Sequence, residues 1–333
     1  MDEAREIRQI LDVMSGKDKW LVLAHTKPDG DTCGCASAIA KFGMRIGKEV
    51  TVGCTDPPPP IYTFLFEDID CREMESLSDE FTNAGCLIIC VDTSNTERAV
   101  GGISEAASRC EIINIDHHSD NSKYGSINWI DSHASATGEM ITELLSASEW
   151  GIAKSEADSL YVAIVTDNGH FRFSSTSARS HECAIKLINA GISLNAIDCE
   201  LDATLSTNAL KLMARAFSRT ETFADGLCAL FWLSQKDFTE TNTTRNDKEN
   251  IVNVLLRIKG VQIAAMCSEQ DDGVRVNLRA RVPFSVHDIA ARFGGGGHPL
   301  ASGCTIKTPL PDALSLLRDE MTRYAAPGVH NNK

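Results

Sequence analysis

The stretch His25-Thr26-Lys27-Pro28-Asp29-Gly30-Asp31 determines how the rest of the chain is interpreted. It follows a short apolar run, Trp20-Leu21-Val22-Leu23-Ala24, and precedes a segment rich in small residues. Pro28 and Gly30 favour a tight turn that brings one imidazole and two carboxylates together. Hard divalent cations prefer oxygen ligands with an occasional imidazole. Taken alone, the stretch is equally well explained as half of a metal site or as a solvated acidic turn after a strand.

Length, charge and cysteine usage limit the classes of protein to which the chain can belong. The 333 residues, of which 43% are hydrophobic, predict two domains. The net charge of −14 disfavours a partner bound through long stretches of phosphate backbone, so any nucleic-acid partner is expected to be short. Apolar runs such as Cys86–Val91 are too short to span a bilayer, and the N-terminus has no signal-peptide pattern. Twelve cysteines without a Cys-x-x-Cys pair indicate a reducing compartment, and we expect a cytoplasmic protein.

Apolar periodicity predicts that helices and strands alternate through the first 191 residues. Strands are expected at 20–24, 49–53, 86–91 and 111–115, and helices at 3–14, 32–46, 137–147, 154–166 and 177–190. Strands that are apolar throughout and that alternate with helices indicate a mainly parallel sheet with helices on both faces. The sequence therefore predicts an α/β domain over residues 1–191.

The pattern changes after Gly191. Residues 192–218 are expected to form a helical linker, and residues 219–333 a smaller α/β domain with a mixed sheet. In that domain we expect strands at 227–233, 261–267, 273–281 and 302–308, helices at 247–258, 285–292 and 311–325, and a polar loop at 239–244.

Candidate ligand residues follow three of the predicted strands at the point where each strand ends. His25, Asp29 and Asp31 come after the first strand, Asp92 directly follows the strand 86–91, and Asp116-His117-His118 follows the strand 111–115. Ligands of parallel sheets bind outside the carboxyl ends of the strands, so we expect these side chains to share one edge. With Asp167 from a predicted helix end, the candidate metal ligands are His25, Asp29, Asp31, Asp92, His117 and Asp167.

This set of four carboxylates and two imidazoles is large enough to hold two metal ions that share one carboxylate. Its mixture of nitrogen and oxygen ligands suits Mn²⁺ best, with Mg²⁺ or Co²⁺ as alternatives. Two such ions stabilise an in-line phosphoryl displacement. The structural alternative is that Asp92 and Asp167 cap helices while His117 is a hydrogen-bonded core histidine. The shared sheet edge favours the metal site.

A second group of candidate residues lies near the C-terminus, in Gly294-Gly295-Gly296-Gly297-His298. Glycines leave backbone N–H groups open and can wrap an anion, and His298 adds a donor. Arg275, Arg279 and Arg281 upstream supply positive charge. We interpret this segment as a phosphate- or nucleotide-binding site, with a flexible hairpin loop as the alternative.

Two shorter segments have both structural and functional interpretations. Ser135-Ala136-Thr137-Gly138-Glu139 matches a capping box that opens a helix, and the structural interpretation is favoured. Phe171-Arg172-Phe173 offers either an aromatic face for a base or a strand edge packed on the core.

Together these motifs resemble those of a known family. His25-Thr26-Lys27-Pro28-Asp29-Gly30-Asp31, Val91-Asp92-Thr93-Ser94, Asp116-His117-His118 and Thr166-Asp167-Asn168-Gly169 resemble, in order, the four motifs of the DHH phosphoesterases. The glycine run with His298, followed by Ala301-Ser302-Gly303, resembles the signature of the DHH-associated C-terminal domain. The resemblance extends from about residue 5 to residue 325. In its size, and in having no expected membrane helices or extra domains, the chain resembles the stand-alone oligoribonuclease (nano-RNase) branch of this family.

The resemblance implies a role for each motif residue. One Mn²⁺ ion takes His25, Asp29 and Asp92, and the other takes Asp31, Asp92, His117 and Asp167, so that Asp92 bridges. The implied catalytic residues are Asp92, His118, which faces the scissile phosphate, and Asp116, which orients a histidine. The implied substrate-binding residues are Arg279, Gly295, Gly296, Gly297 and His298. Asn168, Ala280 and Ser302 depart from the usual family residues, without removing a metal ligand.

We therefore expect a Mn²⁺-dependent phosphodiesterase that cuts RNA of two to a few nucleotides into mononucleotides. The resemblance also implies 3′-phosphoadenosine 5′-phosphate phosphatase activity. One alternative is a phosphodiesterase for cyclic or linear di-AMP, and another, from a different class, is a catalytically silent nucleotide sensor. No membrane or long nucleic acid is expected as a partner, and the sequence leaves the oligomeric state open, with a homodimer among the options.

Overall fold

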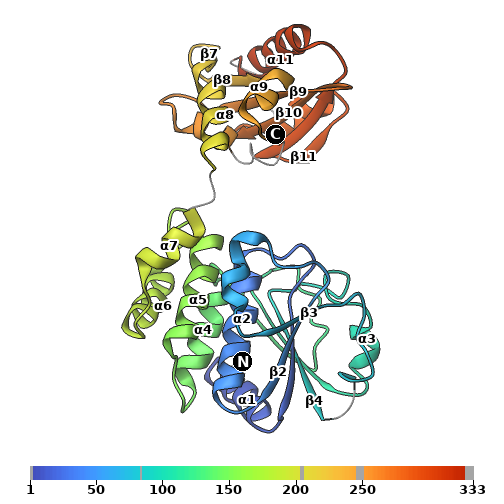
Figure 1. Cartoon of the computed structure of the whole chain (residues 1–333), viewed down its shortest axis with the longest axis vertical. Helices are drawn as coiled ribbons and strands as arrows, with labels where there is room; N and C mark the ends of the chain where they lie inside the picture. The colour runs from blue at the N-terminus through green and yellow to red at the C-terminus, as the bar shows by residue number, and fades with distance from the viewer. Residues whose placement is uncertain (1–2, 83–84, 203–205, 245–250, 327–333) are drawn as a thin grey trace. The chain divides into compact units, whose positions relative to one another are not determined.

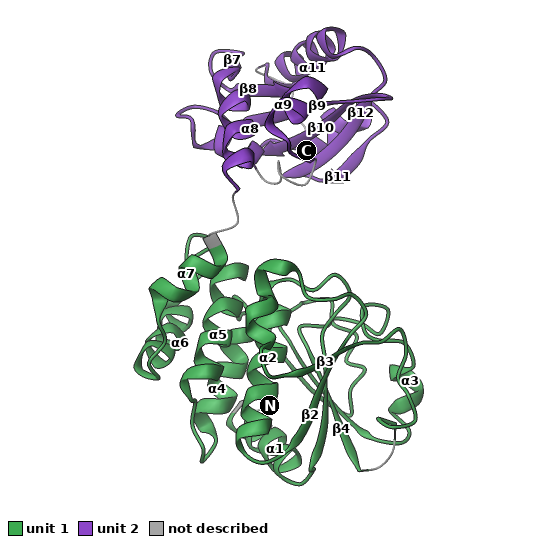
Figure 2. Cartoon of the chain, in the orientation of Figure 1, with its two compact units in different colours: residues 1–204 green, residues 205–333 purple. Residues whose placement is uncertain are grey.

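The computed structural model describes residues 3–82, 85–202, 206–244 and 251–326. The chain folds as two compact units, Met1–Thr204 (unit 1) and Leu205–Lys333 (unit 2), which are coloured separately in Figure 2. The division falls inside the range 192–218, where a helical linker was expected. Of the two helices in that range, α7 (Leu194–Asp202) belongs to unit 1 and α8 (Thr207–Ser218) to unit 2.

Unit 1 is built on a six-stranded sheet in which all neighbouring strands are parallel. The strand order is β3-β2-β1-β4-β5-β6. The strands are β1 (Lys19–Leu23), β2 (Glu49–Cys54), β3 (Asp70–Glu73), β4 (Cys86–Val91), β5 (Glu111–Asp116) and β6 (Ile127–Ile130). The predicted parallel sheet is confirmed, and β1, β4 and β5 lie side by side at its centre.

Helices and connecting segments cover both faces of this sheet (Figure 1). The helices of unit 1 other than α7 are α1 (Glu3–Ser15), α2 (Gly30–Arg45), η1 (Pro60–Phe66, a 3₁₀ helix), α3 (Ile103–Ala106), α4 (Thr137–Ala147), α5 (Lys154–Asp167) and α6 (Ala178–Asn189). Residues of α1, α2, α4 and α5 pack on one face, and α3 packs with connecting segments on the other. Burial on both faces explains why all six residues of β4 are apolar and inaccessible.

Small residues in α2 allow it to pack closely against α5. A Cβ atom added at Gly34 would lie 2.4 Å from the carbonyl oxygen of Ser159, so only glycine fits there. Cys33 and Cys35 beside it are fully buried. Ten of the twelve cysteines are buried, with Cys71 and Cys199 as the exceptions, so most of them serve as small core residues.

Unit 2 contains a six-stranded mixed sheet of order β11-β12-β10-β9-β8-β7. Its strands are β7 (Glu221–Phe223), β8 (Cys228–Leu233), β9 (Ile263–Gln270), β10 (Gly273–Ala280), β11 (Gly296–His298) and β12 (Ala301–Ile306). Only the β8–β9 pair is parallel among these described strands. The helices α10 (Val286–Arg292) and α11 (Leu310–Ala325) share one core with the sheet, whereas α8 and η3 (Ile251–Arg257, a 3₁₀ helix) share another.

Two predictions and one alternative interpretation for unit 2 need correction. The polar loop expected at 239–244 is wrong in its first part, because α9 (Gln235–Thr241) extends into it. Ser234 caps this helix by accepting a hydrogen bond from the backbone N–H of Asp237. The helix expected at 247–258 is the 3₁₀ helix η3, and residues 245–250 lie outside the described residues. The end of the glycine run forms the edge strand β11 instead of a flexible loop.

Within 3–82, 85–202, 206–244 and 251–326, no helix combines the length and the apolar character that a bilayer span requires.

Candidate metal centre

The carboxyl ends of β1, β4 and β5 bring the predicted metal ligands of unit 1 to one edge of the sheet. His25 follows β1, Asp92 directly follows β4, and His117 directly follows β5. Asp29 caps the N-terminus of α2, where its carboxylate accepts a hydrogen bond from the Thr32 N–H at 3.1 Å, and Asp31 lies in the first turn of that helix. The tight turn inferred from Pro28 and Gly30 therefore ends in a helix cap.

His25, Asp29 and Asp92 form the first group of ligand atoms, which lie within 4.8 Å of one another. The Nε2 atom of His25 is 3.7 Å from an oxygen of Asp29 and 3.4 Å from an oxygen of Asp92. Its other ring nitrogen, Nδ1, lies 2.8 Å from the carbonyl oxygen of Thr26, which accepts the proton and leaves Nε2 as the free nitrogen. Nε2 is buried and lacks a hydrogen-bond partner among the described residues. A buried nitrogen that faces two carboxylates without a donor between them fits a cation.

Asp31, His117 and Asp167 form the second group. The Nε2 atom of His117 is 3.9 Å from Asp31 and 3.5 Å from Asp167. It is also 3.6 Å from Asp92 Oδ1, while Asp92 Oδ2 faces His25. Asp92 therefore joins the two groups, with one oxygen toward each.

The carboxylates of this centre are close enough to perturb one another. Burial and the charges of Asp92 and Asp167 raise the pKa of Asp31 well above its usual value. Burial also raises the pKa of Asp167 to about 6, although the nearby His117 opposes the rise. Because these carboxylates are unfavourable as a set of uncompensated charges, the donor set fits divalent cations in its charge as well as in its geometry.

The N-terminus of α4 holds two of these carboxylates in position. The backbone N–H groups of Thr137 and Gly138 donate to the two oxygens of Asp31, at 2.7 and 3.0 Å. The Thr137 hydroxyl donates to Asp92 Oδ1 at 3.0 Å. The capping interpretation of this segment missed the role of Thr137, and the observed N-cap is Ala136. Its only sequence signal was a Thr-Gly pair at a helix start.

His118 is held by a hydrogen-bond chain that runs through Asp116 to Asn121. Its Nδ1 atom lies 2.7 Å from an oxygen of Asp116, and Asn121 donates to the other oxygen of Asp116 at 2.5 Å. The hydrogen bond to Asp116 raises the pKa of His118. Since Nδ1 is engaged, Nε2 is the ring atom that is available for a ligand. Asn121 was not among the predicted residues.

Comparison with known proteins places the chain in a family. A model described as "DHH family, N-terminal domain" matches residues 19–164, and a model of the DHHA1 domain matches residues 227–326. A Streptococcus mutans protein named "Probable bifunctional oligoribonuclease and PAP phosphatase NrnA" is 30% identical over 297 residues, which cover 89% of this chain and 92% of that protein. The chain belongs to the DHH family. It is a hydrolase that acts on phosphoester bonds.

Two further proteins show the extent of the similarity. The Bacillus subtilis (strain 168) protein named "Bifunctional oligoribonuclease and PAP phosphatase NrnA" is 29% identical over 301 residues, or 90% of this chain and 92% of its own. A crystal structure of an exopolyphosphatase-related protein from Bacteroides fragilis superposes with a TM-score of 0.78 at 25% identity, and covers 96% of both chains. The DHH chain described here thus matches these relatives over nearly their full length.

The DHHA1 domain places two predicted substrate-binding residues, Arg279 and His298, on the strands that flank β12. In the register of the sheet, Ala301 of β12 pairs with Arg279 of β10 on one side and with His298 of β11 on the other. Directly paired residues of antiparallel strands point to the same face. Arg279 and His298 therefore flank the small Ala301 side chain on one face of the sheet.

The glycines of this domain serve different purposes. A Cβ atom added at Gly295 would lie 2.2 Å from the carbonyl oxygen of Gly303, and one at Gly297 would lie 2.7 Å from that of Ala301. Both positions are thus required by packing within the hairpin. A Cβ atom at Gly296 would meet nothing within 4 Å, so this backbone is open to a ligand.

The aromatic segment after Asp167 does not form a strand edge. His170 and Phe171 both have positive φ, which belongs to a turn. Phe171 stacks on His181, with ring centroids 4.9 Å apart, whereas Phe173 is 58% exposed. The strand interpretation is therefore wrong, and Phe173 is accessible to a ligand.

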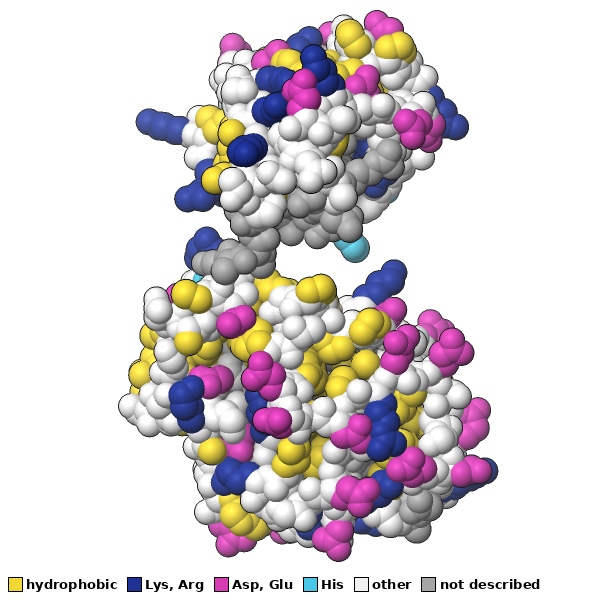
Figure 3. Space-filling view, viewed as in Figure 1, with side chains coloured by type: hydrophobic (Ala, Val, Ile, Leu, Met, Phe, Trp, Pro, Cys, Tyr) yellow, Lys and Arg dark blue, Asp and Glu magenta, His cyan; other side chains and the backbone are white. Residues whose placement is uncertain are grey.

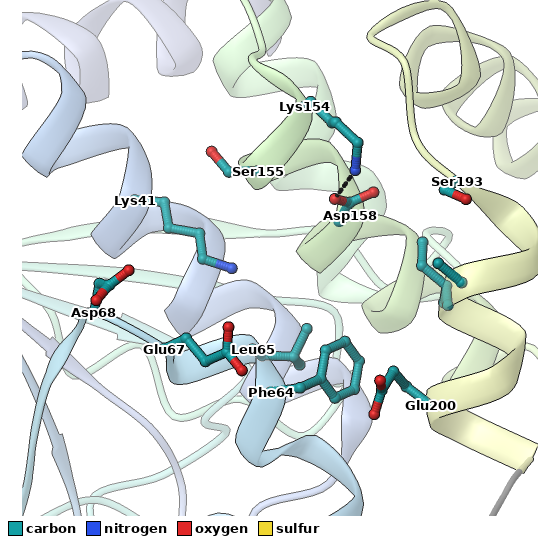
Figure 4. Close-up of a pocket in the computed structure, with 12 residues that line it drawn as sticks. Lys41, Phe64, Leu65, Glu67, Asp68, Lys154, Ser155, Asp158, Ser193 and Glu200 are labelled. Carbon is teal, nitrogen blue, oxygen red and sulfur yellow. Dashed lines mark hydrogen bonds and ion pairs between the residues drawn. The ribbon is translucent and has the colours of Figure 1, made fainter.

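A separate pocket of the DHH domain lies between α2, η1, α5 and α7 and has a volume of about 410 Å³ (Figure 4). Lys41 reaches into it and donates to the Ser159 hydroxyl at 3.0 Å. The carboxylate of Asp158 pairs with Lys154, as the dashed line in Figure 4 marks. None of the predicted site residues lines this pocket, so it is distinct from the metal centre.

Proposed function

We propose that the chain is a Mn²⁺-dependent phosphodiesterase that hydrolyses RNA of two to a few nucleotides to mononucleotides. We propose further that it removes the 3′-phosphate of 3′-phosphoadenosine 5′-phosphate. The names of the two relatives from Streptococcus mutans and Bacillus subtilis support this substrate class. The observation that carries the proposal is the position of Asp92, whose two oxygens face two separate groups of ligand atoms.

In this proposal two Mn²⁺ ions occupy the centre. Residues of the first group, His25, Asp29 and Asp92, hold one ion, and Asp31, Asp92, His117 and Asp167 hold the other. When bound, two such ions lower the pKa of a water molecule and offset negative charge on a phosphoryl group. The mixed nitrogen and oxygen ligands are the reason for naming Mn²⁺, with Mg²⁺ or Co²⁺ as alternatives.

The protein's own groups orient the reaction. Thr137 fixes Asp92 through its hydroxyl and Asp31 through its backbone N–H, so that neither carboxylate can rotate freely. The Asp116 carboxylate accepts a hydrogen bond from the Nδ1–H group of His118. When the ring is protonated, its Nε2–H group can then donate to a phosphate oxygen. Developing negative charge on the phosphoryl group strengthens this donation.

Residues of the DHHA1 domain are proposed to bind the rest of the substrate. Arg279 and His298 are the proposed donors, and the run Gly295–Gly297 lies beside His298 on β11. The Gly295 N–H already donates to the carbonyl oxygen of Ala290 at 2.9 Å, so the proposal places the ligand against the backbone of the later glycines. The open position at Gly296 supports this assignment, because a ligand can approach the backbone there.

The charge distribution supports a short substrate. On the face of unit 1 in Figure 3, the acidic side chains are interspersed with isolated Lys and Arg side chains, without a continuous basic stripe among those drawn in colour. The net charge is −14. A long RNA backbone needs a basic track, whereas a short one needs only local groups at the site.

A substrate-length series tests the proposal. Chelator-stripped protein is reloaded with Mn²⁺, Mg²⁺ or Co²⁺ and incubated with a dinucleotide, a trinucleotide, a pentanucleotide and a long RNA, and with 3′-phosphoadenosine 5′-phosphate and cyclic di-AMP. We expect rapid release of mononucleotides from the shortest RNAs and no cleavage of the long one. Asp92→Ala should be inactive with every substrate, and Asp18→Ala, which changes a fully solvated carboxylate, should match the wild type.

Three results would contradict the proposal. A higher kcat/KM for cyclic di-AMP than for dinucleotide RNA would assign the chain to the alternative phosphodiesterase. Nucleotide binding without turnover would assign it to a sensor. Wild-type turnover by Asp92→Ala would show that the metal assignment is wrong.

A further inference from the structure

Arg98 lies on a loop that is anchored beside the metal centre. The loop starts at Asp92, and Asn95 organises it by accepting hydrogen bonds from the backbone N–H groups of Glu97 and Arg98, both at 3.1 Å. The carbonyl oxygen of Arg98 then accepts the backbone N–H of Thr26 at 2.8 Å. Arg98 is thereby fixed between the residue after His25 and the loop that carries Asp92.

The guanidinium of Arg98 differs from those of the structural arginines in the same unit. Three other arginines of unit 1 pair directly with carboxylates: Arg45 with Glu156, Arg72 with Asp70, and Arg179 with Glu143. The Arg98 side chain is partly buried, yet it makes no hydrogen bond or ion pair with any residue in the described part of the chain. A partly buried guanidinium without a partner, in a unit rich in carboxylates, is available to bind an anionic ligand.

We propose that Arg98 binds the phosphoryl group of the substrate at the metal centre. The ligand class is a phosphate ester of a nucleoside, and the inference rests on the proposed phosphodiesterase function. A guanidinium presents several N–H donors in a plane and matches two phosphate oxygens at once. Because the backbone of Arg98 is held by hydrogen bonds of its own, little further ordering is needed when the phosphate binds.

Other nearby cations are less suited to this task. Lys27 is exposed, and its backbone N–H is engaged by Asp56. Arg172 donates from Nε to the carbonyl oxygen of Gly169 at 2.7 Å, which directs it onto its own turn. A purely structural role for Arg98 would need side-chain contacts, whereas the contacts that hold its loop are made by the backbone.

Binding of AMP and of adenosine to the full-length, Mn²⁺-loaded protein tests the inference. We expect Arg98→Ala to weaken the binding of AMP by about 10- to 100-fold, since a charge-assisted hydrogen-bond pair to phosphate is lost. Adenosine, which lacks the phosphate, should bind equally to both proteins. Arg98→Lys, which keeps the charge but not the fork, should fall between them. The matched control is Arg109→Ala, an exposed arginine elsewhere in the same unit.

Steady-state kinetics and folding measurements complete the test. With dinucleotide RNA, Arg98→Ala should lower kcat/KM by a similar factor, while its melting temperature and Mn²⁺ affinity match those of the wild type. Unchanged AMP affinity in Arg98→Ala overturns the inference, as does an equal loss of adenosine binding. If the wild type cleaves no substrate, the proposed function fails, and the comparison of AMP with adenosine still decides the role of Arg98. Should Arg98→Ala fail to fold, Arg98→Lys and Arg98→Gln provide the same comparison.

Discussion

Removing the Thr137 hydroxyl tests whether the start of α4 holds the metal ligands. Thr137 is fully buried, and its hydroxyl donates to Asp92 at 3.0 Å. Thr137→Val keeps the shape of the side chain and also keeps the backbone N–H that donates to Asp31. The substitution therefore removes one hydrogen bond to a carboxylate and leaves no large cavity.

The size of the effect follows from the kind of contact that is lost. A hydrogen bond to a charged group contributes about 1.5–3 kcal/mol. Groups that orient a metal ligand typically affect metal affinity by about 10- to 100-fold when removed, which corresponds to about 1.4–2.8 kcal/mol. The two estimates agree, so we expect the Kd for Mn²⁺ to rise by that factor.

Isothermal titration calorimetry of chelator-stripped protein with Mn²⁺ measures this change directly. Thr137→Ser restores the hydroxyl and should bind Mn²⁺ nearly as well as the wild type. Thr142→Val is the matched control, because the Thr142 hydroxyl is buried in the same helix but donates to the Gly138 carbonyl oxygen at 2.7 Å. Wild-type affinity in Thr137→Val, or an equal loss in Thr142→Val, would refute the reasoning.

Three further predictions concern stability. Gly295→Ala should destabilise the protein by about 1–3 kcal/mol through overpacking, because its Cβ atom would lie 2.2 Å from a facing carbonyl oxygen, whereas Gly296→Ala should change urea unfolding by less than about 0.5 kcal/mol. Gly34→Ala should destabilise the DHH domain by at least as much as Gly295→Ala, since its Cβ atom would lie 2.4 Å from the backbone of α5, and a thermal melt equal to that of the wild type would contradict the close packing. Burial favours a higher pKa for Asp237, but hydrogen bonds from Arg219 outweigh burial and lower this pKa. The ionised carboxylate therefore stabilises the fold fully above the unfolded pKa of about 3.9, and this contribution is lost progressively as the pH falls toward the folded pKa. Asp237→Asn should remove that part of the acid dependence and cost about 1–3 kcal/mol at neutral pH, and an unfolding curve with unchanged acid dependence would show that the ion pair is unimportant.

Strands buried on both faces were predictable, whereas polar edge strands were not. The run Cys86–Val91 is apolar at every position and forms the buried central strand β4. By contrast, β3 carries the residues Asp70–Glu73, most of which are exposed. Its strand conformation comes from pairing with β2, for which Asp-Cys-Arg-Glu has no local signal. An edge strand of this kind can be predicted only when the strand with which it pairs is known.

The candidate metal ligands could be singled out from the sequence because each residue lies in a short motif at the end of an element. Thr137 was missed because its role depends on contact with Asp31, from which it is 106 positions away in the sequence. Asn121 and Arg98 were missed for a related reason. Asn and Arg are common in loops, and only the positions of Asp116 and the Asp92 loop give these two residues a task. Residues that support ligands carry weaker local signals than the ligands themselves.

The glycine run shows how one sequence signal can combine two causes. Gly295 and Gly297 are needed because a side chain would collide with β12, so they would be present in this hairpin without any ligand. Gly296 lies between them, and a Cβ atom added there would meet no other atom within 4 Å. The hairpin and the anion-binding interpretations are therefore compatible, and Gly296 is the position of the run at which the proposed ligand has space to approach the backbone.

The charges of unit 1 explain how an acidic chain is suited to a small phosphate ester. Burial and mutual repulsion raise the pKa values of Asp31 and Asp167, so their ionised forms need positive charge nearby. The N–H donors of Thr137 and Gly138 hold Asp31 but bring no full positive charge. A phosphate ester adds further negative charge, and Arg98 is suited to meet it because no carboxylate of the described residues pairs with its guanidinium. The attraction of such local charge falls off over about 10 Å. Under the proposed function we therefore expect the centre to attract one phosphate, and the net charge of −14 to disfavour a longer RNA backbone.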